Sequence, residues 1–288
     1  MLICQRRSLI LPLFALLVVV LELVAAPVVS ARISQDSTIK QGLTPVQLEI
    51  EKHRQLLSSA DVEDRRHALV RLRAMHHPQA SRAAQAALND PSPIVRATAA
   101  ASVLSLPPAE SAAGLIPLLS DKDEFVRQQV AYALGQTRSS SAVASLVERL
   151  SDKKDSVRGA AAVALGEIAD ATAVTYLAAV LNQQAGLPPA KKGQKSKPEK
   201  NPFVLRAAAH SLGQIRNRAA LPALILALQD ESIEDDVRRE AAWALGRIGD
   251  ASAIPALQQA VTSRDPYLAE TAQEALRKIS KSRSSGPM

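Results

Sequence analysis

Apolar residues recur along most of the chain at a spacing that predicts amphipathic helices. The segment that begins at Val126-Arg127 continues as QQVAYALG, and the segment at Val157-Arg158 continues as GAAAVALG. Counted from the arginine as position 0, apolar residues fall at −1, +3, +4, +6, +7 and +10. Because a helix turns by about 100° per residue, these positions gather into one stripe. Each segment therefore predicts one helix with a single buried face.

This register recurs along the chain, which is typical of a repeat protein. Equivalent positions are 31 residues apart, except for one step of 47 and one of 33. A further apolar segment precedes each amphipathic one, for example at 142–150 and 219–228. Pro222 and Pro255 stand near the starts of such segments, where a helix tolerates proline. Each unit is expected to be a pair of antiparallel helices. Seven units follow from the equivalent positions Arg65, Arg96, Arg127, Arg158, Leu205, Arg238 and Ala269.

The repeats are expected to span residues 44–281. At their start, Thr44 can cap a helix, Pro45 can take its first position and Gln47 can complete a capping box. We expect residues 32–43 to be a disordered tether and residues 282–288 to be a disordered tail.

The step of 47 residues contains an insertion at 185–200, which reads AGLPPAKKGQKSKPEK. Its lysines and prolines, with few apolar residues, cannot supply a packed core. We therefore expect a basic loop between the two helices of the fifth unit. Its lysines are Lys191, Lys192, Lys195, Lys197 and Lys200.

The first 31 residues follow the plan of a secretory signal peptide. Arg6 and Arg7 precede an apolar run at 9–21, and small residues end at Ala31. We expect cleavage after Ala31, which exports the mature protein to the periplasm or cell envelope. The alternative is a retained membrane anchor, although Glu22 and two prolines make the segment a poor one.

Composition narrows the class of protein. The chain is 47% hydrophobic and 22% charged, which excludes a largely disordered protein. Aromatic residues make up only 2%, whereas strands favour them, which argues against an all-β fold. The one cysteine, Cys4, lies in the expected signal peptide, so the folded part has no thiol chemistry.

The net charge of +7 does not by itself indicate a nucleic-acid-binding protein. The insertion carries +4 and the segment 277–283 another +4, while the rest of the expected mature chain carries −2. A solenoid that grips phosphates needs cations along its groove. We therefore do not expect nucleic acid as a partner, and weak contact of the basic loop with an anionic membrane surface is the alternative.

The repeated string resembles the HEAT repeat, in the short variety found in phycobilisome lyases. Their units read roughly Asp, five residues, Arg, two residues, Ala-Ala, one residue, Ala-Leu-Gly. The resemblance implies an all-α, right-handed solenoid, in which the acidic and basic residues form a hydrogen-bonded ladder between neighbouring repeats. Unit five has Glu199 and Leu205 at these positions and unit seven has Ser263 and Ala269, so the ladder is expected to weaken toward the C-terminus. The matching pairs are Asp90 with Arg96, Asp121 with Arg127 and Asp152 with Arg158.

The resemblance also raises two enzymatic alternatives, the phycobilin lyases and deoxyhypusine hydroxylase. The hydroxylase binds iron through His-Glu pairs, and none of the five histidines here is followed by glutamate. The lyases act on cytoplasmic proteins, which conflicts with export. We therefore expect no catalytic residue, metal or cofactor, and keep an enzyme or enzyme subunit of these types as the alternative.

The side of each amphipathic helix that faces away from the core is the candidate binding surface. By resemblance, positions +1, +2, +5 and +9 line the concave face of the solenoid. Position +5 contains the only tryptophan, Trp243, together with Tyr132 and His210. Tryptophan, tyrosine and arginine often dominate interface energy, so we expect these three to bind a protein partner of unknown identity. The alternative is that they only pack between helices. Flanking residues at +1 and +9 are Gln128, Gln136, Gln214, Arg206, Arg239 and Arg247.

These expectations combine into one hypothesis. The chain is an exported, non-catalytic HEAT-type scaffold or adaptor that binds another protein along its concave face.

Overall fold

The computed structural model describes residues 42–182 and 199–284, and within these ranges it contains α-helices and short 3-10 segments but no strand. The prediction of an all-α solenoid is confirmed, while its right-handedness and the count of seven helix pairs stay predictions. The α-helices are α2 (Pro45–Leu56), α3 (Val62–Ala74), α4 (Pro78–Ala84), α5 (Pro93–Ser102), α6 (Pro108–Leu115), α7 (Glu124–Thr137), α8 (Val143–Arg149), α9 (Asp155–Ile168), α10 (Val174–Leu181), α11 (Pro202–Ile215), α12 (Leu221–Gln229), α13 (Asp235–Ile248), α14 (Ile254–Ala260) and α15 (Pro266–Ser284).

The chain divides into two units, residues 1–52 and 53–288. In the described part of the first unit, α2 begins with reciprocal capping. The backbone N–H of Thr44 donates to Oε1 of Gln47 at 2.9 Å, and the backbone N–H of Gln47 donates to Oγ1 of Thr44 at 3.3 Å. This arrangement satisfies two N–H groups that the first turn leaves without helical partners.

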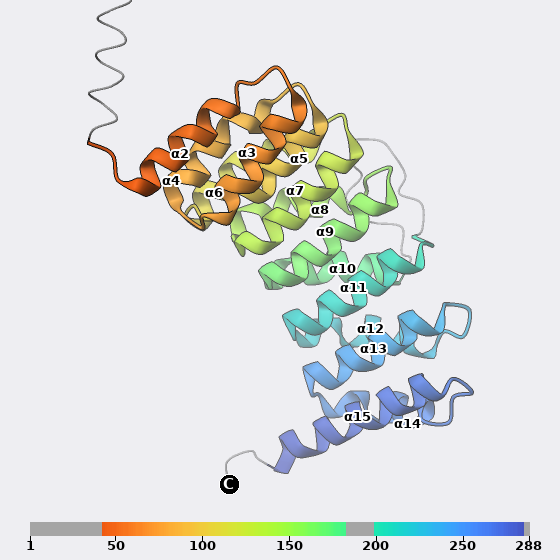
Figure 1. Cartoon of the computed structure of the whole chain (residues 1–288). Helices are drawn as coiled ribbons and strands as arrows, with labels where there is room; N and C mark the ends of the chain where they lie inside the picture. The colour runs from red at the N-terminus through yellow and green to blue at the C-terminus, as the bar shows by residue number, and fades with distance from the viewer. Residues whose placement is uncertain (1–41, 183–198, 285–288) are drawn as a thin grey trace, which may run out of the picture. The chain divides into compact units, whose positions relative to one another are not determined.

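The second unit is built from two layers of helices (Figure 1). The longer helices α3, α5, α7, α9, α11, α13 and α15 pack side by side in chain order, and we call them the second helices. The shorter helices α4, α6, α8, α10, α12 and α14 form the other layer and pack against them. From α8 onward, each shorter helix follows a 3-10 turn.

The core lies between the two layers, as the apolar stripe predicts. Position +7 of four successive units is occupied by leucines that are fully buried. The small residues of the stripe are buried with them, so the second helices approach one another closely. The leucines are Leu134, Leu165, Leu212 and Leu245.

Glycines at position +8 permit this close approach. A Cβ added at Gly135 would lie 2.8 Å from the Cα of Ala164 in the next second helix. A Cβ added at Gly246 would lie at the same distance from the Cα of Ala275. Both neighbours are backbone atoms, which cannot move aside without shifting a helix.

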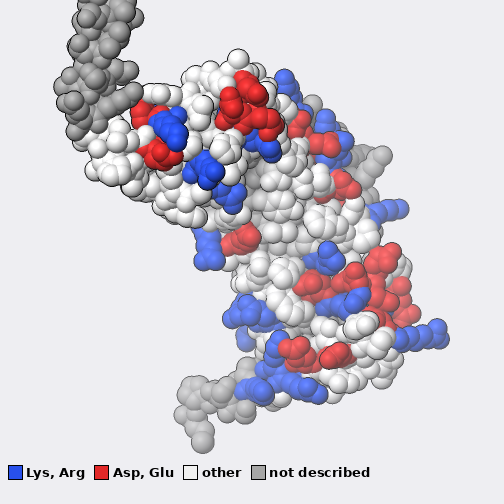
Figure 2. Space-filling view, in the orientation of Figure 1, with Lys and Arg blue, Asp and Glu red and all other residues white. Residues whose placement is uncertain are grey.

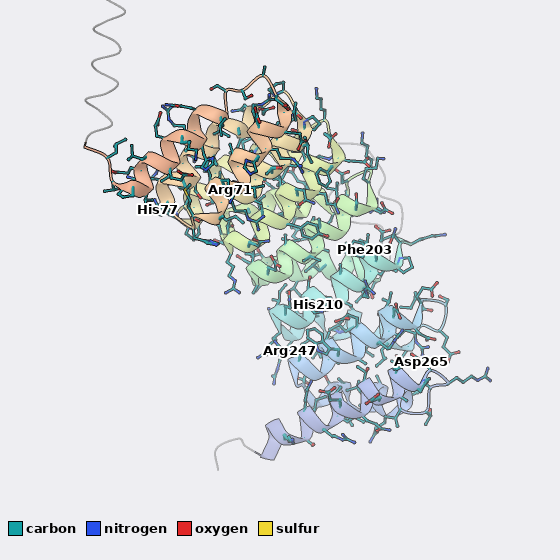
Figure 3. The ribbon with its side chains drawn as sticks, in the orientation of Figure 1. Arg71, His77, Phe203, His210, Arg247 and Asp265 are labelled. Carbon is teal, nitrogen blue, oxygen red and sulfur yellow. The ribbon has the colours of Figure 1, made fainter. Side chains whose placement is uncertain are left out.

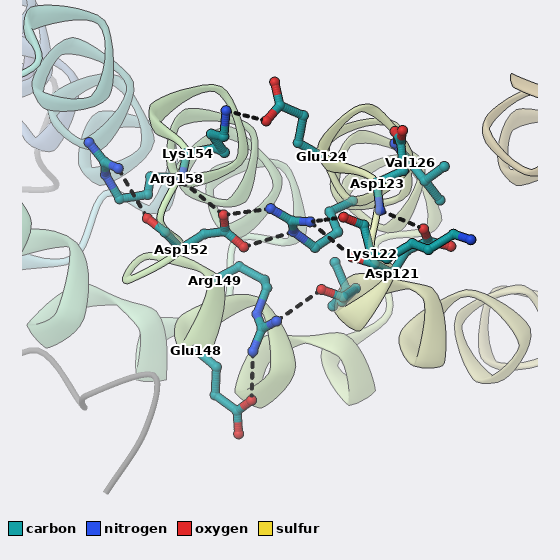
Figure 4. A network of polar contacts seen from close by, with 12 residues as sticks. Asp121, Lys122, Asp123, Glu124, Val126, Glu148, Arg149, Asp152, Lys154 and Arg158 are labelled. Atoms are coloured by element: carbon teal, nitrogen blue, oxygen red, sulfur yellow. Dashed lines mark hydrogen bonds and ion pairs between the residues drawn. The ribbon is translucent and has the colours of Figure 1, made fainter. Parts of the chain in front are cut away.

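An arginine–carboxylate ladder joins the starts of the second helices. Nε of Arg96 donates to Asp121 of the next repeat at 2.8 Å, and its Nη1 donates to the carbonyl of Asp90 in its own repeat at 2.8 Å. In the same way, Arg65 donates to both carboxylate oxygens of Asp90. Arg127 donates to both carboxylate oxygens of Asp152. Figure 4 shows the Asp121 to Arg158 part of this network.

The ladder extends one step beyond the matching pairs. Arg158 donates to Glu199, which is buried although it belongs to the expected loop at 185–200. The longer side chain of Glu199 supplies the carboxylate that aspartate supplies in the other repeats. The ladder then stops, because unit five has Leu205 in place of arginine. Arg238, at the equivalent position in unit six, instead donates to the carbonyl of Leu228 and to Asp235 of its own helix.

The carboxylates of the ladder are held in their charged form. Burial by itself raises the pKa of Asp121, but hydrogen bonds from Arg96 and from the backbone N–H of Asp123 outweigh it, so the pKa lies below its usual range. The same balance of burial against Arg65 and the N–H of Ser92 lowers the pKa of Asp90. Such groups stabilise the fold when ionised.

The expected signal peptide at 1–31, nearly all of the tether at 32–43 and the lysines of the loop other than Lys200 lie outside the described residues. Helix α15 reaches Ser284, so residues 282–284, which were expected to belong to a disordered tail, are helical. Within the described ranges, none of the helices has the length and apolar character needed to cross a membrane.

We predict that Asp121→Asn lowers the free energy of unfolding by about 3 to 5 kcal/mol at neutral pH, because it leaves the buried charge of Arg96 without its carboxylate. The lowered pKa stabilises the fold above the unfolded value of about 3.9 and this contribution is lost as pH falls through the folded value. Urea unfolding of the two proteins should therefore converge in acid. Glu124→Gln, which removes an exposed carboxylate paired with Lys154, serves as control and should change little. Equal losses for both variants would contradict a structural ladder.

We also predict that Gly246→Ala lowers the free energy of unfolding by about 1 to 3 kcal/mol, because the new methyl group meets the backbone of Ala275. Alanine ordinarily stabilises a helix relative to glycine. The control Gly114→Ala in α6 meets only a side-chain carbon of Leu88 at 3.5 Å and should be neutral or stabilising. Thermal unfolding checks both, and a stabilising Gly246→Ala would show that the helices are not in backbone contact.

Candidate binding surface

The exposed side of the second helices carries the candidate residues at position +5. Tyr132 on α7, His210 on α11 and Trp243 on α13 are all half-buried. Basic and acidic side chains are intermixed on this face rather than gathered into a basic stripe (Figure 2). The helices pack in chain order, so α9 lies between Tyr132 and His210, and its residue at +5 is Val163. The structure thus brings together two of the three predicted aromatic positions and leaves Tyr132 apart.

His210, Trp243 and Arg247 form a stack across α11 and α13. The rings of His210 and Trp243 are parallel within 4°, with centroids 4.6 Å apart. The guanidinium of Arg247 lies 5.5 Å from the centroid of the Trp243 ring, within the range of a cation–π interaction. Figure 3 labels His210 and Arg247, with Arg247 toward the end of α13.

Glu240 fixes the histidine in this stack. Its Oε1 lies 2.6 Å from Nδ1 of His210, which is the distance of a hydrogen bond. Glu240 is not among the predicted binding residues, although it stands at position +2 of unit six and so belongs to the exposed side by the register alone. The stack is therefore held from both sides, by Glu240 and by Arg247.

Two of the predicted arginines are engaged by carboxylates. Arg206 lies 3.7 Å from Asp236. Arg239 pairs with Asp236 and Asp265, and its guanidinium lies 5.6 Å from the ring centroid of Tyr267. These arginines are less available to a partner than their position suggests. Gln128, at +1 on α7, is half-buried.

Position +9 forms a second row of side chains, at the ends of the second helices. Here a groove of about 810 Å³ lies along α7, α9, α11 and α13. The glycines at +8 make room for it, since the side chain of Glu167 lies against Gly135 and that of Gln214 against Gly166. The residues that line the groove are Gly135, Gln136, Arg138, Gly166, Glu167, Ile168, Ala169, Gln214 and Arg247.

Three polar atoms of this row have no hydrogen-bond partner in the described part of the chain. They are Oε2 of Glu167, Oε1 of Gln214 and Nε of Arg247. An unsatisfied buried polar atom costs about 1 to 3 kcal/mol. The three side chains as a whole are half-buried, whereas these three atoms are buried.

Glu167 is the residue of this row that was not predicted from the sequence. It occupies +9 in unit four, between Gln136 and Gln214 in the register, and reading every unit at that position would have included it. Burial raises its pKa above the usual range, and the charge of Arg138 opposes this only in part. Neither aspartate nor glutamate occupies +9 in the units centred on α7, α11 and α13.

Among the described residues, no three His, Cys, Asp or Glu side chains gather as metal ligands. His77 caps α4, with its Nδ1 accepting from the backbone N–H of Gln79 at 3.2 Å.

Comparison with known proteins identifies the repeat. A family model described as HEAT repeats matches residues 50–130, 112–186 and 196–280. Among curated protein sequences, none matches this chain. The comparison with solved structures gives several similar folds.

An engineered protein is 22% identical, with a TM-score of 0.51 over 80% of this chain and 68% of that chain. The complex of CpcE and CpcF of phycocyanin lyase from Nostoc sp. PCC7120 is 22% identical, with a TM-score of 0.48 over 83% and 89%. Human deoxyhypusine hydroxylase in complex with glycerol is 19% identical, with a TM-score of 0.39 over 81% and 96%. At these identities the likeness concerns the fold and not the activity.

We predict that Glu167→Gln raises the free energy of unfolding at neutral pH, because it removes a carboxylate whose charged form burial disfavours. A raised pKa means that the native state binds the proton more tightly, so the wild type gains stability relative to the variant as pH falls through the raised value. The difference should vanish below the ordinary glutamate pKa of about 4.3. Urea unfolding at several pH values measures it, and a variant that is less stable at neutral pH would contradict this account of Glu167.

Proposed function

The chain belongs to the HEAT-repeat family, and from this premise we propose that it is an exported, non-catalytic scaffold that binds a protein partner along the exposed face of its second helices. Solenoids of this kind present extended surfaces made from equivalent positions of successive repeats. A partner that lies along such a surface contacts several repeats at once, so its affinity is spread over them.

The stack of His210, Trp243 and Arg247 is the observation that carries this proposal. Tryptophan and arginine are the residue types most often found to dominate binding energy. Here the contacts within the chain itself hold the side chains in place, since the rings of His210 and Trp243 are parallel and Glu240 is hydrogen-bonded to the histidine. Preorganisation of this kind reduces the entropy lost on binding.

The neighbouring groove is further support for partner binding on the same face. It shares Arg247 with the stack, so the aromatic and the polar parts of the surface are continuous. Its side chains retain unsatisfied hydrogen-bonding atoms, as expected of a surface that is completed by another molecule. The proposal of export depends on the signal-peptide pattern of residues 1–31. An exported scaffold would meet its partner in the periplasm or cell envelope.

We predict that Trp243→Ala weakens capture of the partner by at least about 30-fold, the loss typical of a tryptophan at the centre of an interface. The measurement is crosslinking and co-purification from the cell envelope fraction, followed by titration of the captured protein. Tyr176→Ala is the matched control, because Tyr176 is an exposed aromatic residue on α10 in the other layer. Both variants should first show wild-type helicity.

Retention of the same partner at full affinity by Trp243→Ala would exclude the stack as the binding site. Equal loss with Tyr176→Ala would indicate a partner on the layer of shorter helices.

A further inference from the structure

Three aromatic side chains recur at one register position of the exposed face. Phe125, Phe203 and Tyr267 are each the second residue of their helix, which is position −2 of units three, five and seven. They are 43%, 41% and 65% exposed, in a chain with only 2% aromatic residues. Position −2 lies within about 40° of +2 and +5 around a helix, so the three rings belong to the exposed face. They form a row at the end where the second helices start.

Two of these rings are supported by the preceding second helix. A Cβ added at Gly159 in α9 would overlap the ring of Phe203. The ring centroid of Tyr267 lies 5.6 Å from the guanidinium of Arg239 in α13. Gly159 and Arg239 both stand at +1 of their units, so the two rings occupy equivalent places. Figure 3 labels Phe203 at the start of α11, on the same edge as Asp265, which lies just before α15.

The row is symmetric about Phe203. Phe125 on α7 and Tyr267 on α15 each lie two second helices away from it, because α9 and α13 intervene. The intervening helices carry the polar residues Ser156 and Asp236 at −2. A two-fold axis at Phe203 would therefore place Phe125 of one copy against Tyr267 of a second copy, and aromatic pairs of this kind attract one another.

The unpaired charges on the two sides of Phe203 have opposite signs. Lys153, at the start of α9, is exposed and forms no ion pair among the described residues. Glu231 and Glu234, which precede α13, are exposed and form none either within that part of the chain. Other charged side chains at these starts already pair within the chain: Lys154 with Glu124, Asp235 with Arg238, and Asp236 with Arg239.

These charges favour an antiparallel arrangement of two copies. The two-fold axis at Phe203 sets α9 of one copy opposite α13 of the other, so the unpaired lysine faces unpaired carboxylates at both places. A parallel arrangement would set Lys153 opposite itself. The charges and the aromatic rings thus select the same alignment.

The row is long enough for a stable interface. It spans five second helices, from α7 to α15, which at interaxial distances of about 8 to 10 Å extend over about 32 to 40 Å. A standard interface buries about 800 Å² on each partner, which is a patch about 28 Å across.

We propose that this edge binds the same edge of a second copy of the chain, antiparallel about a two-fold axis at Phe203. Two-fold dimers are the commonest symmetric assemblies, and they use one patch twice. The edge is separate from the stack at +5 and the groove at +9. The inference therefore does not depend on the proposed scaffold function.

The first experiment is sedimentation equilibrium of the protein recovered from cells that express the full chain. We expect a concentration-dependent dimer. Lys153→Glu and Glu234→Lys should each raise its dissociation constant at least about tenfold, because each sets like charges opposite one another. The two changes combined should restore the dimer, because they exchange the signs on both sides of the axis. Glu148→Lys, on α8 in the other layer, is the control and should have no effect.

Cysteine crosslinking locates the axis, in a chain whose Cys4 is replaced by serine. Pro202 and Pro266 are exposed prolines at the first positions of α11 and α15. A residue near a two-fold axis meets its own copy. Pro202→Cys should therefore form crosslinked dimers with a short bismaleimide. Pro266→Cys should do so only when mixed with Glu124→Cys, which changes the first residue of α7.

A wild-type protein that stays monomeric at every concentration would overturn the inference and leave the edge to a different partner. A dimer that both charge reversals leave unchanged would also overturn it, as would equal self-crosslinking of Pro202→Cys and Pro266→Cys. None of these results affects capture of a protein through Trp243, so failure of the dimer is distinguishable from failure of the scaffold function.

Discussion

Three neighbouring pairs of second helices, α7 with α9, α11 with α13 and α13 with α15, approach so closely that a Cβ on the glycine at +8 would lie 2.8 Å from a backbone atom of the next helix, and this constraint shapes their exposed face. Glycine at +8 and alanines in the stripe let one helix lie directly against the next. Side chains at +5 and +9 therefore lie over the preceding second helix. As a result Trp243 lies against Gly213, Glu167 against Gly135 and Gln214 against Gly166. A row of side chains in fixed register is the outcome, and it provides the stack and the groove.

The two ends of the second helices differ in how their charged groups are paired. At the starts, arginine and carboxylate side chains satisfy one another through the ladder, so that end is electrostatically complete as far as Glu199. At the far ends, arginines complement α7, α11 and α13 but not α9. We therefore interpret the first end as structural.

Much of this architecture could be predicted from the sequence because it depends on period and register. The stripe at +7, the capping box at Thr44 and the placement of Trp243 on the exposed side all follow from counting residues. The ladder contacts required the resemblance to known repeats, since spacing alone does not tell which repeat an arginine reaches. Glu199 could be aligned with the ladder across the insertion, but its bond to Arg158 could not be foreseen.

Other features depend on the surroundings of a residue in three dimensions. The register places Glu167 on the groove, but only the structure shows that its Oε2 is buried against Gly135 and has no hydrogen-bond partner among the described residues. Likewise, the sequence groups Tyr132 with His210 and Trp243, whereas a whole helix, α9, separates it from them. The signal peptide and the basic loop stay predictions, because nearly all of their residues lie outside the described ranges.

The central claim is that the exposed face of the second helices binds one protein, and site-specific photocrosslinking tests it most directly. A photoreactive amino acid would replace Gln136, which is exposed beside the groove, or Leu226, which is 56% exposed on α12 in the other layer. Irradiation of cells would be followed by identification of the crosslinked protein. The account predicts one discrete adduct from position 136 and none from position 226. Adducts from position 226 alone would contradict it.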